Sequence, residues 1–311
     1  MAVIEVDGLH KRYGSVVAVD DVSFTVEEGE IFGVLGRNGA GKTTAVESIA
    51  GLRKPDAGTV RVLGMEPRSD RRKVRNVLGV QLQEGTLPDK ARVAELMRLY
   101  RSFYAEGADP DRLLAELGLD DKREAFIDDL SGGQQQRLSI ALALIGNPRV
   151  AILDELTTGL DPQARRDTWD LIEQIRDAGV TIVLVTHFME EAQRLCDRVA
   201  IIDGGRVAAL DAPRAIVARV DGRHRLRLRT AERFPTVLLD AVPEVTAVRT
   251  EGGEVVVTGT GNLLHAVTGT LLAHDVVVTE TRMEQASLDD AFLAITGREL
   301  HGNAEGGESS R

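Results

Sequence analysis

The sequence predicts an α/β protein with a mostly parallel sheet core, an antiparallel β part, a helical insertion and a small C-terminal α+β domain. Three short apolar runs, at residues 31–35, 150–153 and 180–186, are typical of buried strands, and amphipathic stretches separate them. Buried strands that alternate with helices indicate a parallel sheet covered on both faces. A glycine-rich segment directly after the first run adds the strand–turn–helix order of a phosphate-binding loop.

Length and charge limit the functions that the chain can have. Its 311 residues are enough for one large domain and one small one. With 38 Lys and Arg against 49 Asp and Glu, the formal net charge is −11, and only 4% of the residues are aromatic. These values argue against a protein that grips nucleic-acid phosphates or stacks on bases, so we expect no nucleic-acid partner.

The sequence shows neither a membrane-spanning pattern nor an export signal. The longest purely apolar run covers residues 140–145, whereas a spanning helix needs about 20 predominantly apolar residues. The first residues lack the basic start and the long apolar core of a signal peptide. Cys196 is the one cysteine, which excludes an intrachain disulfide and suits a reducing compartment. We therefore expect a soluble, cytosolic chain without a transmembrane segment.

Two domains and a tail are predicted. The first domain covers residues 1–218 and contains a helical subdomain at about residues 85–145, where leucines recur at helical spacing. An accessory α+β domain is expected at residues 219–299, and residues 300–311, rich in Gly, Ser and charge, form a flexible tail. The elements predicted for the accessory domain are a strand at 224–229, a hairpin of 245–249 and 254–258, a helix at 262–273, a strand at 276–279 and a helix at 288–295.

A phosphate-binding loop is predicted after the first strand, because the segment fits the pattern G-x-x-x-x-G-K-[ST]. Glycines let the backbone wrap a phosphate closely, and the helix that follows presents the positive end of its dipole to the anion. Lys42 would neutralise the β- and γ-phosphate oxygens, and Thr43 would bind Mg²⁺. The alternative is a glycine-rich turn with a solvated lysine. The predicted ATP-binding residues of this loop are Gly36, Arg37, Asn38, Gly39, Ala40, Gly41, Lys42, Thr43 and Thr44.

An apolar strand that ends in two carboxylates supplies what the loop lacks. Asp154 and Glu155 follow the run at residues 150–153. Asp154 is placed to hold Mg²⁺ through water, and Glu155 to polarise the attacking water as a general base. Taken alone, the pattern also fits a strand capped by solvated acids. Together with the loop at Lys42, it indicates hydrolysis of a nucleotide.

A second helix start that suits phosphate lies at Ser131-Gly132-Gly133-Gln134. Ser131 stands where a helix N-cap would, and the two glycines leave the backbone bare. A plain N-cap is the alternative explanation. Because one nucleotide has only one γ-phosphate, a second such site in one chain indicates that Ser131 serves the nucleotide of another subunit.

In the order and spacing of these motifs, residues 3–218 resemble the ATP-binding subunits of ATP-binding cassette (ABC) transporters, which have a P-loop NTPase fold. The resemblance implies that Tyr13 stacks on adenine and that His187 senses the γ-phosphate as a catalytic switch. It also implies that Gln83 contacts Mg²⁺ and relays to the membrane subunit, with Gln81 as a nearby alternative. Asp161 matches the loop that crosses the dimer interface. The alternative interpretations are that Tyr13 is an ordinary surface residue and that His187 has only a structural role.

The same resemblance implies an assembly. Two copies of the chain meet head to tail, and each ATP lies between Lys42 of one copy and Ser131 of the other. A separate integral membrane permease receives the motion, so the chain is expected at the cytoplasmic face of the membrane.

One position departs from the family pattern, because Leu156 stands where the family commonly has proline. The departure frees φ and adds an N–H donor, which affects the local loop geometry rather than the carboxylate chemistry.

Residues 286–298 are similar to the chain end of bacterial exporters of the daunorubicin-resistance type. That likeness implies export of a hydrophobic, drug- or antibiotic-like compound. Export of another cargo (lipid, polysaccharide or ion) stays open, since cargo is read by the membrane partner. A cassette ATPase that acts on DNA or ribosomes is disfavoured by the single cassette and the negative charge. A regulatory module without turnover is disfavoured by Glu155.

Overall fold

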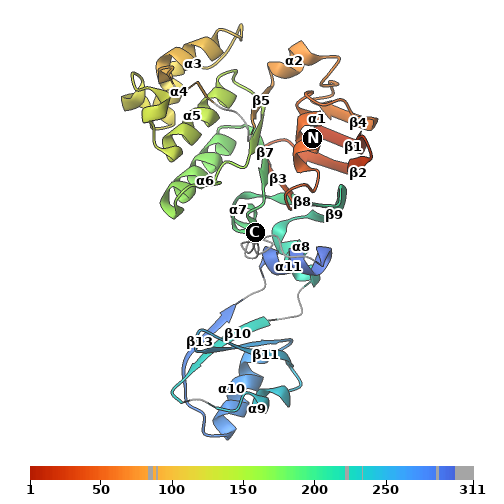
Figure 1. Cartoon of the computed structure of the whole chain (residues 1–311), viewed down its shortest axis with the longest axis vertical. Helices are drawn as coiled ribbons and strands as arrows, with labels where there is room; N and C mark the ends of the chain where they lie inside the picture. The colour runs from red at the N-terminus through yellow and green to blue at the C-terminus, as the bar shows by residue number, and fades with distance from the viewer. Residues whose placement is uncertain (83–86, 89, 221–223, 233, 285–286, 298–311) are drawn as a thin grey trace, which may run out of the picture. The chain divides into compact units, whose positions relative to one another are not determined.

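The computed structural model describes residues 1–82, 87–88, 90–220, 224–232, 234–284 and 287–297. Its residues form two compact units, one up to Pro213 and one from Arg214 to Glu299 (Figure 1). This division lies a few residues before the boundary predicted at residue 218. The predicted tail at residues 300–311 lies outside the described residues.

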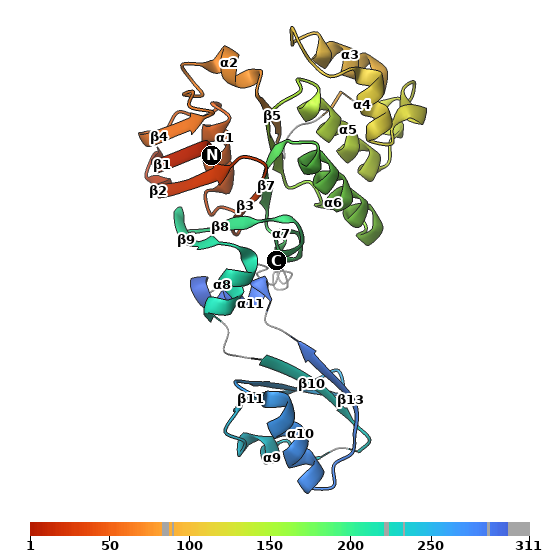
Figure 2. The same ribbon diagram turned by 180° about the vertical axis from the view of Figure 1, so that it is seen from behind.

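The first unit is built on a six-stranded sheet with the order β5-β6-β7-β3-β8-β9 (Figures 1 and 2). The strands from β5 to β8 run parallel, and β9 pairs antiparallel with β8 at the edge. Every residue of β3, β6 and β7 is buried, as expected for strands covered on both faces. The strands are β3 (Ile31–Leu35), β5 (Leu78–Gln81), β6 (Val150–Asp154), β7 (Thr181–Thr186), β8 (Arg198–Asp203) and β9 (Arg206–Asp211).

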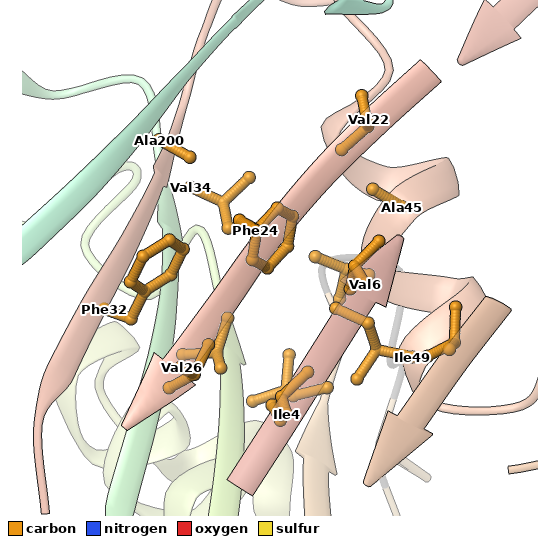
Figure 3. Close-up of a cluster of buried hydrophobic side chains, with 14 of the residues drawn as sticks. Ile4, Val6, Val22, Phe24, Val26, Phe32, Val34, Ala45, Ile49 and Ala200 are labelled. Atoms are coloured by element: carbon orange, nitrogen blue, oxygen red, sulfur yellow. The ribbon is translucent and has the colours of Figure 1, made fainter. Parts of the chain in front are cut away.

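A three-stranded antiparallel sheet with the order β2-β1-β4 packs against the first sheet and the helix α1. Figure 3 shows the core between them, where Phe24 and Phe32 stack with ring centroids 5.1 Å apart. Ile4 and Ile49 are also fully buried there. This core fixes the position of α1, and therefore of the loop that precedes it. The elements are β1 (Ala2–Tyr13), β2 (Val16–Glu27), β4 (Ala57–Val62) and α1 (Lys42–Ile49).

Helices cover the other side of the six-stranded sheet (Figures 1 and 2). The helix α4 begins where the sequence supplies strong signals, since the Asp109 side chain caps it and Pro110 occupies its first turn. No helix in the described part of the chain is long and apolar enough to cross a membrane. The helices of this unit are α2 (Arg71–Arg75), α3 (Val93–Arg101), α4 (Pro110–Glu116), α5 (Gly132–Leu144), α6 (Pro162–Asp177) and α7 (Met189–Leu195), with 3₁₀ turns at Asp120–Lys122 and Ile127–Asp129.

The second unit is an α+β fold with an antiparallel sheet of order β11-β12-β10-β13. From β10 to β13 its elements run β-α-β-β-α-β, which is the split βαβ arrangement of ferredoxin-like folds. Leu226 and Leu228 of β10 join Val267 and Leu271 of α10 in its core. Its elements are α8 (Pro213–Val220), β10 (His224–Thr230), α9 (Val237–Asp240), β11 (Val245–Glu251), β12 (Glu254–Gly259), α10 (Leu263–Ala273), β13 (Val278–Glu284) and α11 (Leu288–Thr296).

One predicted element of this unit is displaced. The strand expected at residues 276–279 begins at Val278 and runs to Glu284. The reason is local, because the Val276 N–H donates to the Leu271 carbonyl at 2.9 Å and so closes the end of α10. The predicted hairpin does form, with β11 and β12 flanking the two glycines.

Candidate active site

Three segments that carry predicted site residues follow neighbouring strands that end at one edge of the six-stranded sheet. The strand β7 lies between β6 and β3, with Leu35 opposite Thr186 and Asp154 opposite Val185. Ligands of open α/β sheets bind outside the carboxyl ends of the strands. The phosphate loop after β3, the acids at the end of β6 and His187 after β7 therefore belong to one site.

The backbone of the loop at residues 36–41 requires glycine at particular positions. Gly39 and Gly41 have φ values of 80° and 106°, a region that favours glycine. A Cβ on Gly41 would lie 2.3 Å from the Ala18 carbonyl oxygen, and one on Gly36 would lie 2.3 Å from that of Ile202. The loop is thus held against β2 on one side and β8 on the other.

The Lys42 side chain folds back into this loop and bonds to its backbone. Its Nζ donates to the Gly36 carbonyl at 2.7 Å and to the Arg37 carbonyl at 3.2 Å. The residue is only 5% exposed, and burial lowers the pKa of its amino group, opposed by the charges of Glu155 and Asp154. The lysine therefore lies within the electrostatic reach of both acids.

The start of α1 is suited to an anion. Gly41 is its N-cap and provides no side-chain hydrogen bond, so no side chain caps the first N–H groups of the helix. Asn38, Gly39 and Thr43 are exposed there, whereas Ala40 is buried. Two oxygen groups of the kind that bind Mg²⁺ belong to this region, since Thr43 lies in the first turn of α1 and the charge of the Asp154 carboxylate acts on Lys42.

Glu155 and His187 are in direct contact. Glu155 Oε1 lies 3.1 Å from His187 Nδ1, and the two side chains are 6% and 20% exposed. The Glu155 N–H donates to the Val185 carbonyl at 2.8 Å, which ties it to the strand that carries the histidine. Glu155 has a φ of 50°, a strained value for a residue with a side chain, and such strain is common at functional sites. A carboxylate beside a histidine in a largely buried position can accept a proton from water.

Of the two candidate glutamines, only Gln81 lies among the described residues. Gln83 lies outside the described residues. The Gln81 side chain is occupied locally, because its Oε1 accepts from the Asp154 N–H at 2.9 Å and its Nε2 donates to the Leu82 carbonyl at 3.1 Å. Gln81 therefore supports the backbone beneath the acidic pair.

Ser131 and its neighbours are not brought to Lys42 within one chain. Ser131 caps α5, with its Oγ accepting from the Gln134 N–H at 3.3 Å and its own N–H donating to Gln134 Oε1 at 3.0 Å. Both views place α5 on the opposite side of the central sheet from α1 (Figures 1 and 2). Ser131 and Gly132 are exposed and Gly133 is half-buried. The N-cap role is thus real, and it leaves this surface open.

Asp161 and Tyr13 also lie at the surface. Asp161 caps α6 and accepts from the N–H groups of Ala164 and Gln163, and these bonds lower the pKa of its carboxyl. Tyr13 ends β1 with 41% of its surface exposed. Lys11 Nζ lies 5.5 Å from the centroid of its ring, so the phenol is flanked by positive charge.

Sequence reasoning missed several residues that lie near His187 or next to its segment. The Phe188 ring lies 4.1 Å from the His187 ring between centroids, and the Arg165 guanidinium lies 4.9 Å from the Phe188 ring. Glu191 is fully buried and bonded to Trp169. The sequence contained a signal for Glu191. This acidic residue follows His187 by four positions and shares the apolar face of its helix with Ala192 and Leu195.

Comparison with known proteins points to one family. The sequence profile described as "ABC transporter" matches residues 19–158. The Nod factor export ATP-binding protein I of Paraburkholderia xenovorans (strain LB400) is 38% identical, over 96% of this chain and 98% of that protein. Its counterpart in Burkholderia thailandensis is 42% identical, over 70% of this chain and 73% of that protein.

Solved structures agree with these sequence relatives. The structure of an ATP-binding subunit of an ABC transporter superposes with a TM-score of 0.63 and 28% identity, covering 70% of this chain and 92% of that one. The structure of cbiO1 from Clostridium perfringens, part of the ABC transporter complex cbiONQ, gives 0.63 and 26%, covering 70% and 91%.

Proposed function

Because the chain belongs to the ABC transporter family and is an ATPase of that family, we propose that it powers export of a hydrophobic, drug- or antibiotic-like compound through a separate membrane permease. The observation that carries the ATPase part is the contact of Glu155 with His187 beside Lys42, at the edge where three parallel strands end. Export is supported by relatives that are named for export over nearly the whole length of the chain. The drug-like cargo is supported by the C-terminal likeness at residues 286–298.

In this proposal each group at the edge has a role in hydrolysis. The N–H groups of residues 36–44 and the Lys42 amino group bind the phosphates of ATP, and Tyr13 stacks on the adenine. Thr43, Asp154 and Gln83 would hold Mg²⁺, which when bound supplies positive charge that offsets the phosphates. Glu155 takes the proton of the attacking water, and His187 holds the carboxylate in place and senses the γ-phosphate.

The second copy supplies what one chain lacks. We propose that Ser131, with Gly132, Gly133 and Gln134, contacts the ATP held by the loop of the other copy, and that Asp161 lies at the interface between the copies. The exposed start of α5, on the other side of the sheet from α1, supports this arrangement. ATP then joins two copies through charge-assisted hydrogen bonds, and hydrolysis weakens them. The chain lies at the cytoplasmic face of the membrane, and a separate integral membrane permease receives this motion.

Co-purification tests the transport role. Tagged full-length chain, expressed in its own host and extracted in a mild detergent, should retain a multi-span membrane protein. Loss of that protein should sensitise cells to amphipathic drugs and should leave ATP binding by the purified chain unchanged. Retention of ribosomes or DNA in place of a membrane protein would refute the transport role.

A different cargo is the second candidate, and the names of the relatives favour it. These proteins are described as Nod factor export ATP-binding proteins, and their similarity extends over the second unit. A host that lacks the chain but keeps its drug tolerance, while it fails to secrete a glycan or lipid, would favour this candidate over the drug-like cargo.

A further inference from the structure

Glu191 is a buried acid that the chemistry above does not use. It lies in α7, one helical turn after His187, and its residue is 0% exposed. A carboxyl group buried without partners is expensive, so such a group is normally retained for a specific interaction.

Its contacts come from segments on either side of the active site. Trp169 Nε1 of α6 donates to Glu191 Oε1 at 3.1 Å. The hydroxyls of Thr186 and Thr157 are also near enough to interact with the carboxyl, and burial raises the pKa of Glu191 against these interactions. Thr186 directly precedes His187.

Thr157 belongs to the other catalytic segment, because it follows Glu155 by two positions. Its residue is 0% exposed. Within the described residues, Thr157 Oγ1 and Glu191 Oε2 are buried atoms without a hydrogen bond of normal geometry. Buried polar atoms are nearly always satisfied, and the Thr157 hydroxyl acts on the Glu191 carboxyl, so we expect these two groups to pair.

We propose that Glu191 is a positioning residue that holds Glu155 and His187 at the separation that hydrolysis requires. It acts through Thr157 on the side of the glutamate and through Thr186 on the side of the histidine. The proposal rests on the roles proposed above for Glu155 and His187 and adds the group that sets their spacing.

The same geometry links these segments to α6. Trp169 anchors the carboxyl from that helix, and Asp161 caps the start of the same helix. A second link is the stack of Arg165 on Phe188, next to the histidine ring. The helix α6 is therefore linked to the segment of His187 by two contacts, and Glu191 provides the buried one.

The test is steady-state ATP hydrolysis by the purified full-length chain. Glu191→Ala should lower kcat about tenfold or more and leave KM for ATP within about twofold, because the phosphate loop is untouched and only the reacting groups lose alignment. Glu191→Gln should restore most of kcat, since the amide keeps an acceptor for Trp169 and a polar atom for the threonine hydroxyls.

A second variant avoids dependence on the folding of Glu191→Ala. Thr157→Val keeps the shape of the side chain and removes only its hydroxyl, and it should lower kcat in the same direction with KM unchanged. The matched control is Thr168→Val, a buried threonine of α6 whose hydroxyl bonds to the Ala164 carbonyl at 2.8 Å. That control should keep the wild-type kcat.

Three outcomes would overturn the proposal. They are a wild-type kcat in both Glu191→Ala and Thr157→Val, a loss that Glu191→Gln does not restore, and a rise in KM with kcat unchanged. Glu155→Gln, measured alongside, separates the two proposals. Full turnover in Glu155→Gln would refute the assignment of the base itself, whereas an inactive Glu155→Gln beside a fully active Glu191→Ala refutes only the positioning role.

Discussion

The two units of the chain differ in whether they bury charged side chains. In the first unit, Lys42, Asp154 and Glu191 are nearly inaccessible to water, with exposures of 5%, 1% and 0%. In the described part of the second unit no charged residue is buried. Arginines of its strand β10 form ion pairs that are partly open to solvent, such as Arg229 with Glu254 at 2.9 Å.

The difference separates chemistry from scaffold. Exposed ion pairs contribute little to stability, about 0–1 kcal/mol each, and they do not prepare a group for reaction. Buried charges reduce stability unless they are paired, and they are the groups whose protonation a site can control. We therefore expect substitutions in the first unit to change turnover more than stability, and substitutions in the second unit to do the reverse.

The largest effect is expected at Lys42. Lys42→Ala removes the buried amino group that bonds to the Gly36 and Arg37 carbonyls of the phosphate loop, so ATP hydrolysis should fall by about 100-fold or more. Phosphate release by the full-length chain measures this change. Lys54→Ala is the matched control, because Lys54 follows α1 at the surface and should not affect turnover. Equal rates in the two variants would refute the assignment of the loop.

Glu155→Gln should separate binding from hydrolysis. The amide cannot accept the proton of water, so turnover should fall by about 100-fold while ATP binding is retained. The variant should then accumulate as an ATP-bound dimer, which light scattering detects. A variant that stays monomeric with ATP bound would count against two copies sharing the nucleotide.

Ser131→Asp distinguishes the helix cap from the phosphate contact. Aspartate caps helices as well as serine does, so Tm should be unchanged. Its negative charge would repel a γ-phosphate, so hydrolysis should fall by about tenfold. Ser131→Thr is the control that keeps both the cap and the hydroxyl. Wild-type turnover in Ser131→Asp would leave the cap as the whole role of this serine.

The second unit is tested by Leu228→Ala. Leu228 is 1% exposed and belongs to the core of the ferredoxin-like sheet, so its truncation should cost about 2–5 kcal/mol of unfolding free energy. Calorimetry should show a lower transition for this unit, while ATP hydrolysis at 25 °C stays near wild type. A matching loss of turnover would break the contrast between the two units.

The smallest effect is a pH dependence at Glu191. Burial raises its pKa above the ordinary value of 4.5, opposed by Thr186, Trp169, Thr157 and the charge of Arg165. A carboxyl whose pKa is raised in the folded state contributes stability below pH 4.5 and loses it as the pH rises through the folded pKa. The Tm of Glu191→Gln should therefore rise relative to the Tm of wild type as the pH increases from that value to neutrality. A constant Tm difference would contradict the raised pKa.

Local patterns made much of the fold and site predictable. The loop at residues 36–44, the acids after β6 and the hairpin of β11 and β12 each lie within a short stretch of chain. Their residue types dictate the backbone that they adopt. The mostly parallel order followed from buried strands separated by helices.

Contacts between distant segments were not readable in the same way. The pairing of β1 with both β2 and β4 involves several register shifts that no local pattern specifies. The bond of Glu191 with Trp169 joins two helices that the sequence identifies only as amphipathic. Arg165 is followed by a second arginine, and no local pattern predicts that its guanidinium lies 4.9 Å from the Phe188 ring. Side chains that reach across elements are fixed by packing.

The close approach of β2 and β8 to the phosphate loop limits which substitutions the loop can accept. Ala18 and Ile202, from strands that perform no chemistry, leave no room for a side chain on Gly41 and Gly36. The backbone of those two strands therefore restricts positions 36 and 41 of the loop to glycine. A substitution that moves β2 or β8 toward the loop would therefore also displace the backbone that is proposed to bind the phosphates.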